Sequence, residues 1–464
     1  MISLTEVVNA VQGDLIGDGS LRVNGISINT RTNCKGRLFV AIKGENFDAH
    51  EFVQQAQDAG ATALLVERDV ESSLPTIKVD DTHKALTDLS AWWRAQFDIP
   101  VIGVTGSVGK TSVKEMLACI FAKTGKGVVT KGNLNNEIGV PLTLMRLARN
   151  DQYAIVEMGM NNAGEIARIT NMARPTVALI NNAAAAHLEG LGSIEAVADA
   201  KAEIFEGLAK DGVAIINNDD RFAGQWWKQT KQFKQLTFAL DGLADVRADY
   251  YGQGNKLILS VSYKDASFDA ELYALGEHNV RNALAAIAVS FAVGISIEDV
   301  QAGLRDYRPV SGRLNISHAG KLTLIDDTYN ANPLSMLAAI NVLIRYPNHI
   351  FIVGDMAELG DAALSEHERL GRRAAELGVK NLLACGEFAQ AVVDNFNQKT
   401  KNPDTDKAIA FASQNELIEY AVTNIDSGTA LVKGSRSAAM ENVVTALSKS
   451  LQNVSATQER IRKC

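Results

Sequence analysis

The chain has 464 residues, 46% of them hydrophobic and 22% charged, which is typical of a globular protein with about three domains. The formal net charge of -8 argues against a nucleic-acid scaffold, so we expect no nucleic-acid partner. We also expect no membrane span, because no stretch approaches roughly 18 apolar residues, and no signal peptide, because no basic leader opens the chain. The four cysteines show no metal-ligand spacing and predict reduced thiols in a cytoplasmic protein.

The first predicted domain covers residues 1–85. Its apolar runs RLFVAI (37–42) and ATALLVE (61–67) are typical of strands, and they flank a helical pattern over residues 50–60. Strands around a helix predict a small α/β domain.

The second predicted domain covers residues 86–312 and begins with an amphipathic helix, LTDLSAWWRAQFD. Buried strands then alternate with helices, which predicts a parallel sheet with crossover helices. The strands are PVIGVTG, YAIVEMG, TVALINN and GVAIINN. Residues 235–275 show strand-like alternation, as in NKLILSVSY, and predict a small antiparallel addition.

The third predicted domain covers residues 313–464. Four apolar runs lead into polar loops: TLIDDTYN, HIFIVGD, NLLACGE and TALVKGS. With helices between them, they predict a Rossmann-like, doubly wound sheet. In such sheets, ligands bind beyond the carboxyl ends of the strands.

The stretch VTGSVGKTS (104–112) lies between a predicted strand and a predicted helix. A phosphate-binding loop has the pattern G-x-x-x-x-G-K-[ST], whose first glycine would stand where this chain has Val104. The available glycine is Gly106, three residues before Gly109. A plain glycine turn would explain the glycines alone, but a strand, G-K-T and a helix in this order favour a phosphate site.

The residues of this loop suit a bound triphosphate. The two glycines let backbone N–H groups turn toward phosphate oxygens, and the helix N-terminus adds positive potential. Lys110 is expected to bridge the β- and γ-phosphates, and the Thr111 hydroxyl to bind Mg²⁺. The fold class is therefore α/β with three domains, of which the central one is a P-loop (phosphate-loop) ATPase domain with a parallel sheet.

Three further side chains of the second domain could complete a metal site. Glu157 ends the strand YAIVEMG, His187 follows TVALINN, and Lys201 lies in the helix SIEAVADAKAEIF. Taken singly, each has an ordinary explanation: Glu157 as an ion-pair or capping partner, His187 as a solvated histidine and Lys201 as a surface lysine. Together, a carboxylate and an imidazole near a phosphate loop could hold a second hard cation. A plain lysine could not, because its ammonium repels Mg²⁺.

Seven segments resemble the Mur ligases, the ATP-dependent amide ligases of peptidoglycan precursor synthesis. In chain order they are TGSVGKTSVKEM, GNLNNEIGVPLTL, VEMGMNNAGEI, AHLEGLGSIEAVADAKAEIF, GEHNVRNALAA, SGRLN and DDTYNANPLSM. The short loop T-G-x-x-G-K-[ST] is the form this family uses, which accounts for Val104. The resemblance covers residues from about 25 to about 445. LFVAIKGENFDAHEF, VEMGMNNAGEI and DDTYNANP with GDMAELG are most similar to the members that join D-alanyl-D-alanine to UDP-N-acetylmuramoyl-tripeptide.

The resemblance implies a role for each matching position. The implied ATP contacts are Gly106, Ser107, Val108, Gly109, Lys110, Thr111, Ser112, Asn279, Arg313, Asp327, Tyr329 and Asn330. The implied ligands of two Mg²⁺ ions are Thr111, Glu157, His187 and Lys201, with Lys201 carried as a carbamate whose oxygens replace the repelling ammonium. The implied catalytic residues are Lys110, Glu157, His187, Lys201 and Arg313. The implied contacts to the UDP-sugar substrate are Thr30, Arg31, Lys43, Asn135 and Asn136. The chain departs from the family motif D-[ST]-R by having Asn29 before Thr30 and Arg31.

The implied reaction activates a carboxylate with ATP. The terminal carboxylate of the tripeptide becomes an acyl phosphate, and the amine of D-alanyl-D-alanine then displaces phosphate. We expect a monomer whose third domain closes over the loop and excludes water. The sequence leaves open whether the tripeptide ends in meso-diaminopimelate or L-lysine.

Other functions share parts of this pattern. Another Mur-type ligase is one alternative, and a folylpolyglutamate synthase-like ligase is a second, although the latter should lack LFVAIKGENFDAHEF. A third is a binding protein regulated by a nucleotide on its P-loop. A GTPase switch would carry N-K-x-D, whereas Asn255-Lys256 continues with Leu-Ile.

Overall fold

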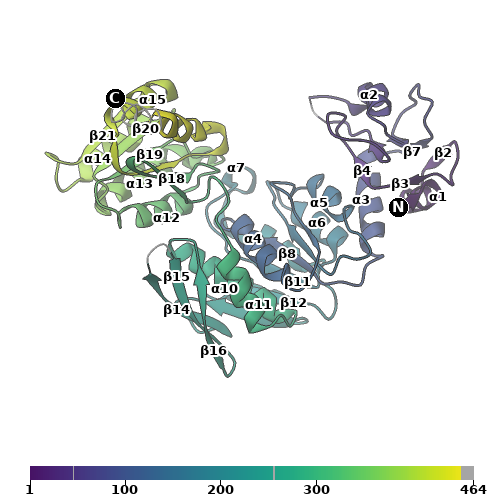
Figure 1. Cartoon of the computed structure of the whole chain (residues 1–464), viewed down its shortest axis with the longest axis horizontal. Coiled ribbons are helices and arrows are strands. Elements are labelled where there is room, and N and C mark those ends of the chain that lie inside the picture. The colour runs from purple at the N-terminus through teal and green to yellow at the C-terminus, as the bar shows by residue number, and fades with distance from the viewer. Residues whose placement is uncertain (45, 254–255, 451–464) are drawn as a thin grey trace, which may run out of the picture.

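Three main sheets organise the described residues, which are 1–44, 46–253 and 256–450 of the computed structural model. In Figure 1 the sheets lie in a row, the purple N-terminal one at one end and the green and yellow C-terminal one at the other. The middle sheet carries the phosphate loop. Cys34, Cys119 and Cys385 are free thiols, and Cys464 lies outside the described residues.

The N-terminal sheet has the strand order β2-β7-β6-β5-β4 and is parallel except for β2. Strands β5 and β6 are buried along their whole length, which suits the apolar runs LFV and ALLV. The predicted helix over residues 50–60 is confirmed as η1 followed by α2. The elements are β1 (Ile2–Ser3), α1 (Leu4–Val11), β2 (Asp14–Ile16), β3 (Arg22–Val23), β4 (Ile26–Ser27), β5 (Leu38–Val40), η1 (Ala49–Phe52), α2 (Val53–Asp58), β6 (Ala63–Val66) and β7 (Thr76–Lys78).

Helix α3 (Thr82–Arg94) connects the N-terminal and middle sheets. It begins four residues before the predicted helix, because the Asp81 side chain accepts hydrogen bonds from two N–H groups of the first turn. Leu86 and Leu89 pack into the N-terminal core, while Arg94 Nε donates to the Ala173 carbonyl of the middle domain at 2.9 Å. The predicted boundary between the first two domains, at residues 85 and 86, falls inside this helix. Because the helix packs against both domains, the exact position of the boundary stays a prediction.

The middle sheet has nine strands in the order β16-β15-β14-β13-β12-β11-β8-β10-β9, parallel from β9 to β14. Apolar cores cover both of its faces. The elements are β8 (Val101–Thr105), α4 (Lys110–Phe121), β9 (Val128–Val129), α5 (Gly139–Leu144), β10 (Ala154–Glu157), α6 (Glu165–Ala173), β11 (Val177–Ile180), α7 (Leu188–Leu191), α8 (Ile194–Ala202), η2 (Glu203–Phe205), β12 (Val213–Asn217), α9 (Ala223–Gln229), β13 (Lys234–Ala239), β14 (Val246–Gln253), β15 (Lys256–Tyr263), β16 (Ala266–Leu272), α10 (Glu277–Ala292) and α11 (Ile297–Asp306).

The predicted antiparallel addition over residues 235–275 is present, but it is not a separate layer. Strand β13 pairs in parallel with β12, and β14, β15 and β16 extend the same sheet, with antiparallel pairing from β14 onward. Buried side chains on β14 and β15 join the same core as the central strands, which is why the sheet continues.

The C-terminal sheet has the order β17-β18-β22-β19-β20-β21 and is parallel except for the β17–β18 pair. It confirms the Rossmann-like pattern of strands and helices. In the part of the chain that the structure describes, no helix has the length and apolar character needed to cross a bilayer. The elements are β17 (Asn315–Ala319), β18 (Lys321–Asp327), α12 (Pro333–Leu343), β19 (His349–Val353), η3 (Gly360–Ala362), α13 (Ala363–Glu376), β20 (Asn381–Cys385), α14 (Ala389–Lys399), β21 (Lys407–Phe411), α15 (Gln414–Asn424), β22 (Ser427–Lys433) and η4 (Arg436–Ala438).

Candidate active site

The phosphate loop runs from the end of β8 at Thr105 to the start of α4 at Lys110. Val104 is still part of β8, pairs with both neighbouring strands and is buried in the core. A strand residue at this position explains why the loop has no glycine there. Gly109 has a φ of +81°, and a Cβ on it would lie 2.3 Å from Asn282 Oδ1, so this position requires glycine.

The backbone N–H groups of the loop fall into two sets. The Ser107 N–H donates to the Asn182 carbonyl at 3.0 Å, and the Val108 N–H donates to Asn182 Oδ1 at 2.9 Å. The first full-turn bond of the helix runs from the Val113 N–H to the Gly109 carbonyl, so the three N–H groups before it have no helical acceptor. These belong to Lys110, Thr111 and Ser112. They lie at the positive end of α4 and can bind phosphate oxygens.

Thr111 and Glu157 bring their oxygens together at the end of the loop. The Thr111 hydroxyl donates to Glu157 Oε2 at 3.0 Å, and Asn135 Nδ2 donates to Glu157 Oε1 at 2.8 Å. Arg313 Nη2 donates to the Thr111 oxygen at 2.9 Å. Glu157 is only 2% exposed. The structure therefore joins four residues that the sequence predicted for this site.

Lys110 and Lys201 lie near each other, and Lys110 also lies near Glu157. Lys110 Nζ donates to the Gly106 carbonyl at 2.7 Å, and burial lowers its pKa against the opposing effect of the Glu157 charge. Burial lowers the pKa of Lys201 well below its usual range, and the positive charge of Lys110 lowers it further. Lys201 is 1% exposed, and no carboxylate among the described residues counters these two effects. Both effects favour the neutral form of the amine.

His187 contacts the C-terminal domain. It precedes α7, which Figure 1 shows between the middle and C-terminal domains. Its Nδ1 lies 2.7 Å from Glu358 Oε2, which is within ion-pair distance. This interaction lowers the pKa of Glu358. Within the described residues, no hydrogen bond or ion pair joins His187 to Glu157 or Lys201.

Lys433 organises the predicted ATP contacts of the C-terminal domain. Its Nζ lies 2.8 Å from Asp327 Oδ2 and donates to the Asn330 carbonyl at 2.8 Å. Burial raises the pKa of Asp327, and the charge of Lys433 acts against that shift. The Arg313 guanidinium lies over the Tyr329 ring, 4.1 Å from its centre. The three predicted ATP contacts Asp327, Tyr329 and Asn330 thus lie near Arg313 or Lys433.

Asn279 belongs to a network of amides that reaches the loop. Its Nδ2 donates to the Leu275 carbonyl at 2.8 Å, and its Oδ1 accepts from Asn282 Nδ2 at 3.3 Å. Asn282 Oδ1 accepts in turn from Asn181 Nδ2 at 2.9 Å. The neighbouring His278 has its pKa lowered to about 4, mainly by burial, so its ring is neutral near pH 7.

Two predicted substrate contacts lie beside the loop. Asn135 donates to Glu157, as described above. Asn136 Oδ1 accepts from the Gly139 N–H at 2.8 Å at the start of α5, and the residue is otherwise exposed. Asn135 therefore contacts the candidate metal-binding carboxylate, whereas Asn136 shapes the adjoining turn.

The other three predicted substrate contacts lie in the N-terminal domain. Arg31 and Lys43 are exposed, and the Thr30 hydroxyl donates to Gln55 Oε1 at 3.3 Å. The Arg31 N–H donates to Asn29 Oδ1 at 2.9 Å. An asparagine oxygen accepts this hydrogen bond as a carboxylate would, so the departure from the family motif leaves the turn intact.

Sequence reasoning missed Glu358 and Lys433. Glu358 follows β19 in the motif GDMAELG, and Lys433 is the last residue of β22 in TALVKGS, so a position at or after a strand end was the available signal. Their partners, His187 and Asp327, are far away in the sequence, and no local pattern indicates them.

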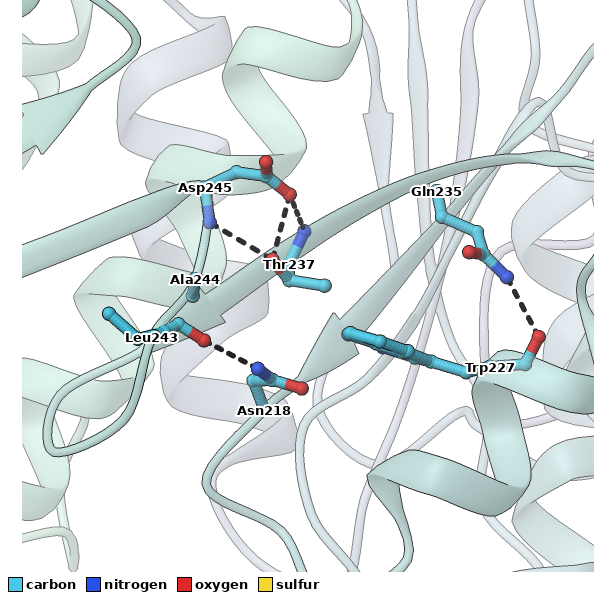
Figure 2. Close-up of a pocket in the computed structure, with 7 residues that line it drawn as sticks. All are labelled: Asn218, Trp227, Gln235, Thr237, Leu243, Ala244 and Asp245. Carbon is cyan, nitrogen blue, oxygen red and sulfur yellow. Dashed lines mark hydrogen bonds between the residues drawn. The ribbon is translucent and has the colours of Figure 1, made fainter.

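A shallow pocket lies elsewhere in the middle domain (Figure 2). It is lined by Asn218, Trp227, Gln235, Thr237, Leu243, Ala244 and Asp245. Asp245 accepts from the Thr237 N–H and hydroxyl at 2.8 and 2.7 Å, and Gln235 donates to the Trp227 carbonyl at 2.9 Å. These polar groups bond to one another and no predicted site residue lines the pocket, so the phosphate-loop edge remains the candidate active site.

Three family models match consecutive parts of the chain. The "Mur ligase family, catalytic domain" model matches residues 22–94, the "Mur ligase middle domain" model residues 104–290, and the "Mur ligase, glutamate ligase domain" model residues 312–436. Each match covers most of one of the three main sheets. The chain belongs to the Mur ligase family.

Particular relatives match over nearly the whole length. The UDP-N-acetylmuramoyl-tripeptide--D-alanyl-D-alanine ligase of Escherichia coli is 41% identical over 96% of this chain and 98% of its own. A crystal structure of MurF from Acinetobacter baumannii covers 96% of this chain and 98% of its own at 35% identity, with a TM-score of 0.89. MurF ligase from Thermotoga maritima, in complex with ADP, covers 94% of this chain and 100% of its own at 27% identity, with a TM-score of 0.80.

Proposed function

We propose that this chain is an ATP-dependent ligase that joins D-alanyl-D-alanine to UDP-N-acetylmuramoyl-tripeptide in peptidoglycan precursor synthesis. The observation that carries the proposal is full-length similarity to a ligase with this substrate pair, including the N-terminal domain. The phosphate loop, the buried Glu157 and the depressed pKa of Lys201 supply the chemistry that such a ligase needs.

The first chemical step makes the tripeptide carboxylate reactive. A carboxylate oxygen attacks the γ-phosphorus of ATP, the bond to the bridging oxygen breaks, and ADP leaves. Lys110 and Arg313 meet near Thr111, where their charges offset the negative charge on the transferring phosphoryl group. The N–H groups at the start of α4 hold the phosphates in place.

The second step forms the amide bond. The neutral amine of D-alanyl-D-alanine attacks the acyl carbon, and a tetrahedral intermediate forms. Its collapse expels inorganic phosphate, and the nitrogen loses a proton. Residues of the C-terminal domain that reach the loop, Arg313 above all, support a role for domain closure in excluding water from the acyl phosphate.

The residues at the loop edge fit a bound Mg²⁺. Thr111 and Glu157 present a hydroxyl and a carboxylate oxygen 3.0 Å apart, and hard cations prefer oxygen ligands. When bound there, Mg²⁺ would offset the charge of the ATP phosphates. Among the described residues, no three His, Cys, Asp or Glu side chains converge on one cation site. A second ion would therefore need His187 and a further oxygen ligand.

Lys201 is the residue that can supply that oxygen ligand. A carbamate forms when a neutral amine adds CO₂ and releases a proton, and burial favours the neutral form of this amine. The modification also explains how a lysine without a carboxylate partner is buried beside Lys110. We therefore propose that Lys201 is carbamylated and that its oxygens, with Glu157 and His187, face the second cation.

The remaining proposals concern the oligomeric state, the cellular compartment and the partners of the enzyme. We propose that it acts as a monomer in the cytoplasm, with both substrates as its partners. The free thiols of Cys34, Cys119 and Cys385 support a reducing compartment.

The test is an amide-forming assay with the purified chain, ATP, Mg²⁺ and D-alanyl-D-alanine. UDP-N-acetylmuramoyl-tripeptide is supplied in two forms, ending in meso-diaminopimelate or in L-lysine. We expect phosphate release only with both substrates present, and a product whose mass is that of tripeptide plus dipeptide minus water. ATP hydrolysis that ignores both substrates would support a nucleotide-regulated protein, and product with glutamate and a folate would support a folylpolyglutamate synthase-like ligase.

A further inference from the structure

The phosphate loop is held at one residue, Val108, by side chains from outside the loop. Asn182, which follows β11, binds it twice: Oδ1 accepts from the Val108 N–H at 2.9 Å, and Nδ2 donates to the Val108 carbonyl at 3.0 Å. Asn181 Nδ2 donates to the same carbonyl at 3.0 Å. Both polar backbone groups of Val108 are therefore bound by amide side chains.

Asn181 links this contact to helix α10. Its Nδ2 also donates to Asn282 Oδ1 at 2.9 Å, and the two residues are 2% and 5% exposed. Asn181 Nδ2 therefore donates to two acceptors, the Val108 carbonyl and Asn282 Oδ1. The same two amides occupy the space beside Gly109, where a Cβ would lie 2.5 Å from Asn181 Nδ2 and 2.3 Å from Asn282 Oδ1.

We propose that Asn181, Asn182 and Asn282 form an amide clamp that positions the short phosphate loop for ATP. The inference rests on the ATP binding proposed above and adds three positioning residues to it. Because the clamp consists of the protein's own groups, it keeps the loop in one conformation before the nucleotide arrives. Less ordering is then needed on binding, which favours affinity.

The clamp also determines which donors face the phosphates. The Val108 N–H is committed to Asn182 Oδ1, so the phosphates bind the N–H groups at the start of α4 instead. Val104 belongs to the strand, so the turn into the helix is confined to the few residues after it. A short turn has few backbone bonds of its own, and the Asn181 and Asn182 side chains, which follow β11, replace them.

Amide hydrogen exchange at Val108 tests the clamp without any nucleotide. The full-length protein is labelled with ¹⁵N-valine, and exchange is followed in the wild type, in Asn182→Ala and in Asn218→Ala. Asn218 is the matched control because it also follows a strand but donates to the Leu243 carbonyl instead. We expect the Val108 amide to exchange about tenfold faster in Asn182→Ala than in the other two. Equal rates in all three proteins, or an unprotected Val108 amide in the wild type, would overturn the clamp.

Kinetic measurements then distinguish positioning of the phosphate loop from a general contribution to the stability of the protein. In Asn182→Ala, we expect the KM for ATP to rise about tenfold, with the KM for the UDP-substrate within twofold of wild type and an unchanged Tm. Adding Asn181→Ala should raise the KM for ATP by less than the product of the single effects, because both side chains bind the same carbonyl. An unchanged KM for ATP, or equal losses for all substrates together with a lower Tm, would contradict the proposal.

The two measurements also separate this inference from the proposed function. If the wild type forms no amide product, the ligase activity is wrong, but the protection of Val108 still decides whether the clamp exists. If Asn182→Ala does not fold, the wild-type protection decides in the same way.

Discussion

The phosphate-loop edge and the predicted substrate residues of the N-terminal domain are built in opposite ways. At the loop edge, Glu157 and Lys201 are almost fully buried, and the Glu157 carboxylate accepts hydrogen bonds from Thr111 and Asn135. In the N-terminal domain, Arg31 and Lys43 are exposed, and their hydrogen bonds use backbone atoms. The proposed ATP half of the site is therefore organised by the fold, whereas the proposed UDP half consists of exposed charged side chains.

The largest effect should come from the organised half. Lys110→Ala is expected to lower turnover by about 10²- to 10³-fold, because it removes a positive charge that is proposed to stabilise the transferring phosphoryl group. The Tm should stay unchanged, and Lys123→Ala, at an exposed ion pair just beyond the same helix, should be near wild type. A Lys110→Ala enzyme that keeps more than about a tenth of the wild-type rate would remove this role from Lys110.

Lys201→Ala should lower turnover by about 10²-fold if the carbamate supplies a metal ligand. Acetate or formate should restore part of the rate by filling the vacated oxygen position, whereas Lys201→Arg should not respond, because its guanidinium still occupies the site. The wild type incubated with ¹³CO₂ should show a carbamate carbon signal in NMR that Lys201→Ala lacks. A fully active Lys201→Ala enzyme would show instead that Lys201 is an ordinary buried lysine.

A smaller effect on turnover is expected at the contact between the middle and C-terminal domains. Glu358→Gln removes the charge that faces His187, and turnover should fall about tenfold. Small-angle scattering should show a larger radius of gyration for the variant than for the wild type with an ATP analogue and UDP-substrate bound. Asp361→Asn makes the same charge change nearby on an exposed residue and should leave both quantities unchanged. A wild-type particle that does not become more compact with these ligands would count against closure.

The smallest effect should come from the exposed half. Arg31→Ala is expected to raise the KM for the UDP-substrate about threefold to tenfold and to leave the KM for ATP unchanged, because an exposed charge contributes little. Arg68→Ala, at another exposed arginine of the same domain, should alter neither constant. If Arg31→Ala changed the KM for ATP as strongly as Lys110→Ala changes turnover, the contrast between the two halves would be lost.

Local patterns were sufficient to predict most elements and several site residues. The strand before the loop, Glu157 at a strand end and Lys201 on a helix were all predicted, and they are present. Each of these signals lies within a window of a few residues, where burial alternation, glycine placement and helix periodicity act directly. The predicted start of α3 is wrong, because Asp81 caps a first turn that begins at Thr82.

The amino-acid sequence by itself determined the α/β class, the phosphate loop and, through its motifs, the family. Only the tertiary structure decided that Val104 is a strand residue, that Asn182 binds Val108, and that β14 to β16 continue the main sheet. It also decided that His187 faces Glu358 and that Lys433 holds Asp327. The physical reason is that these contacts join residues far apart in the sequence, and their partners are chosen by how strands and domains pack. Local propensity carries no information about that choice.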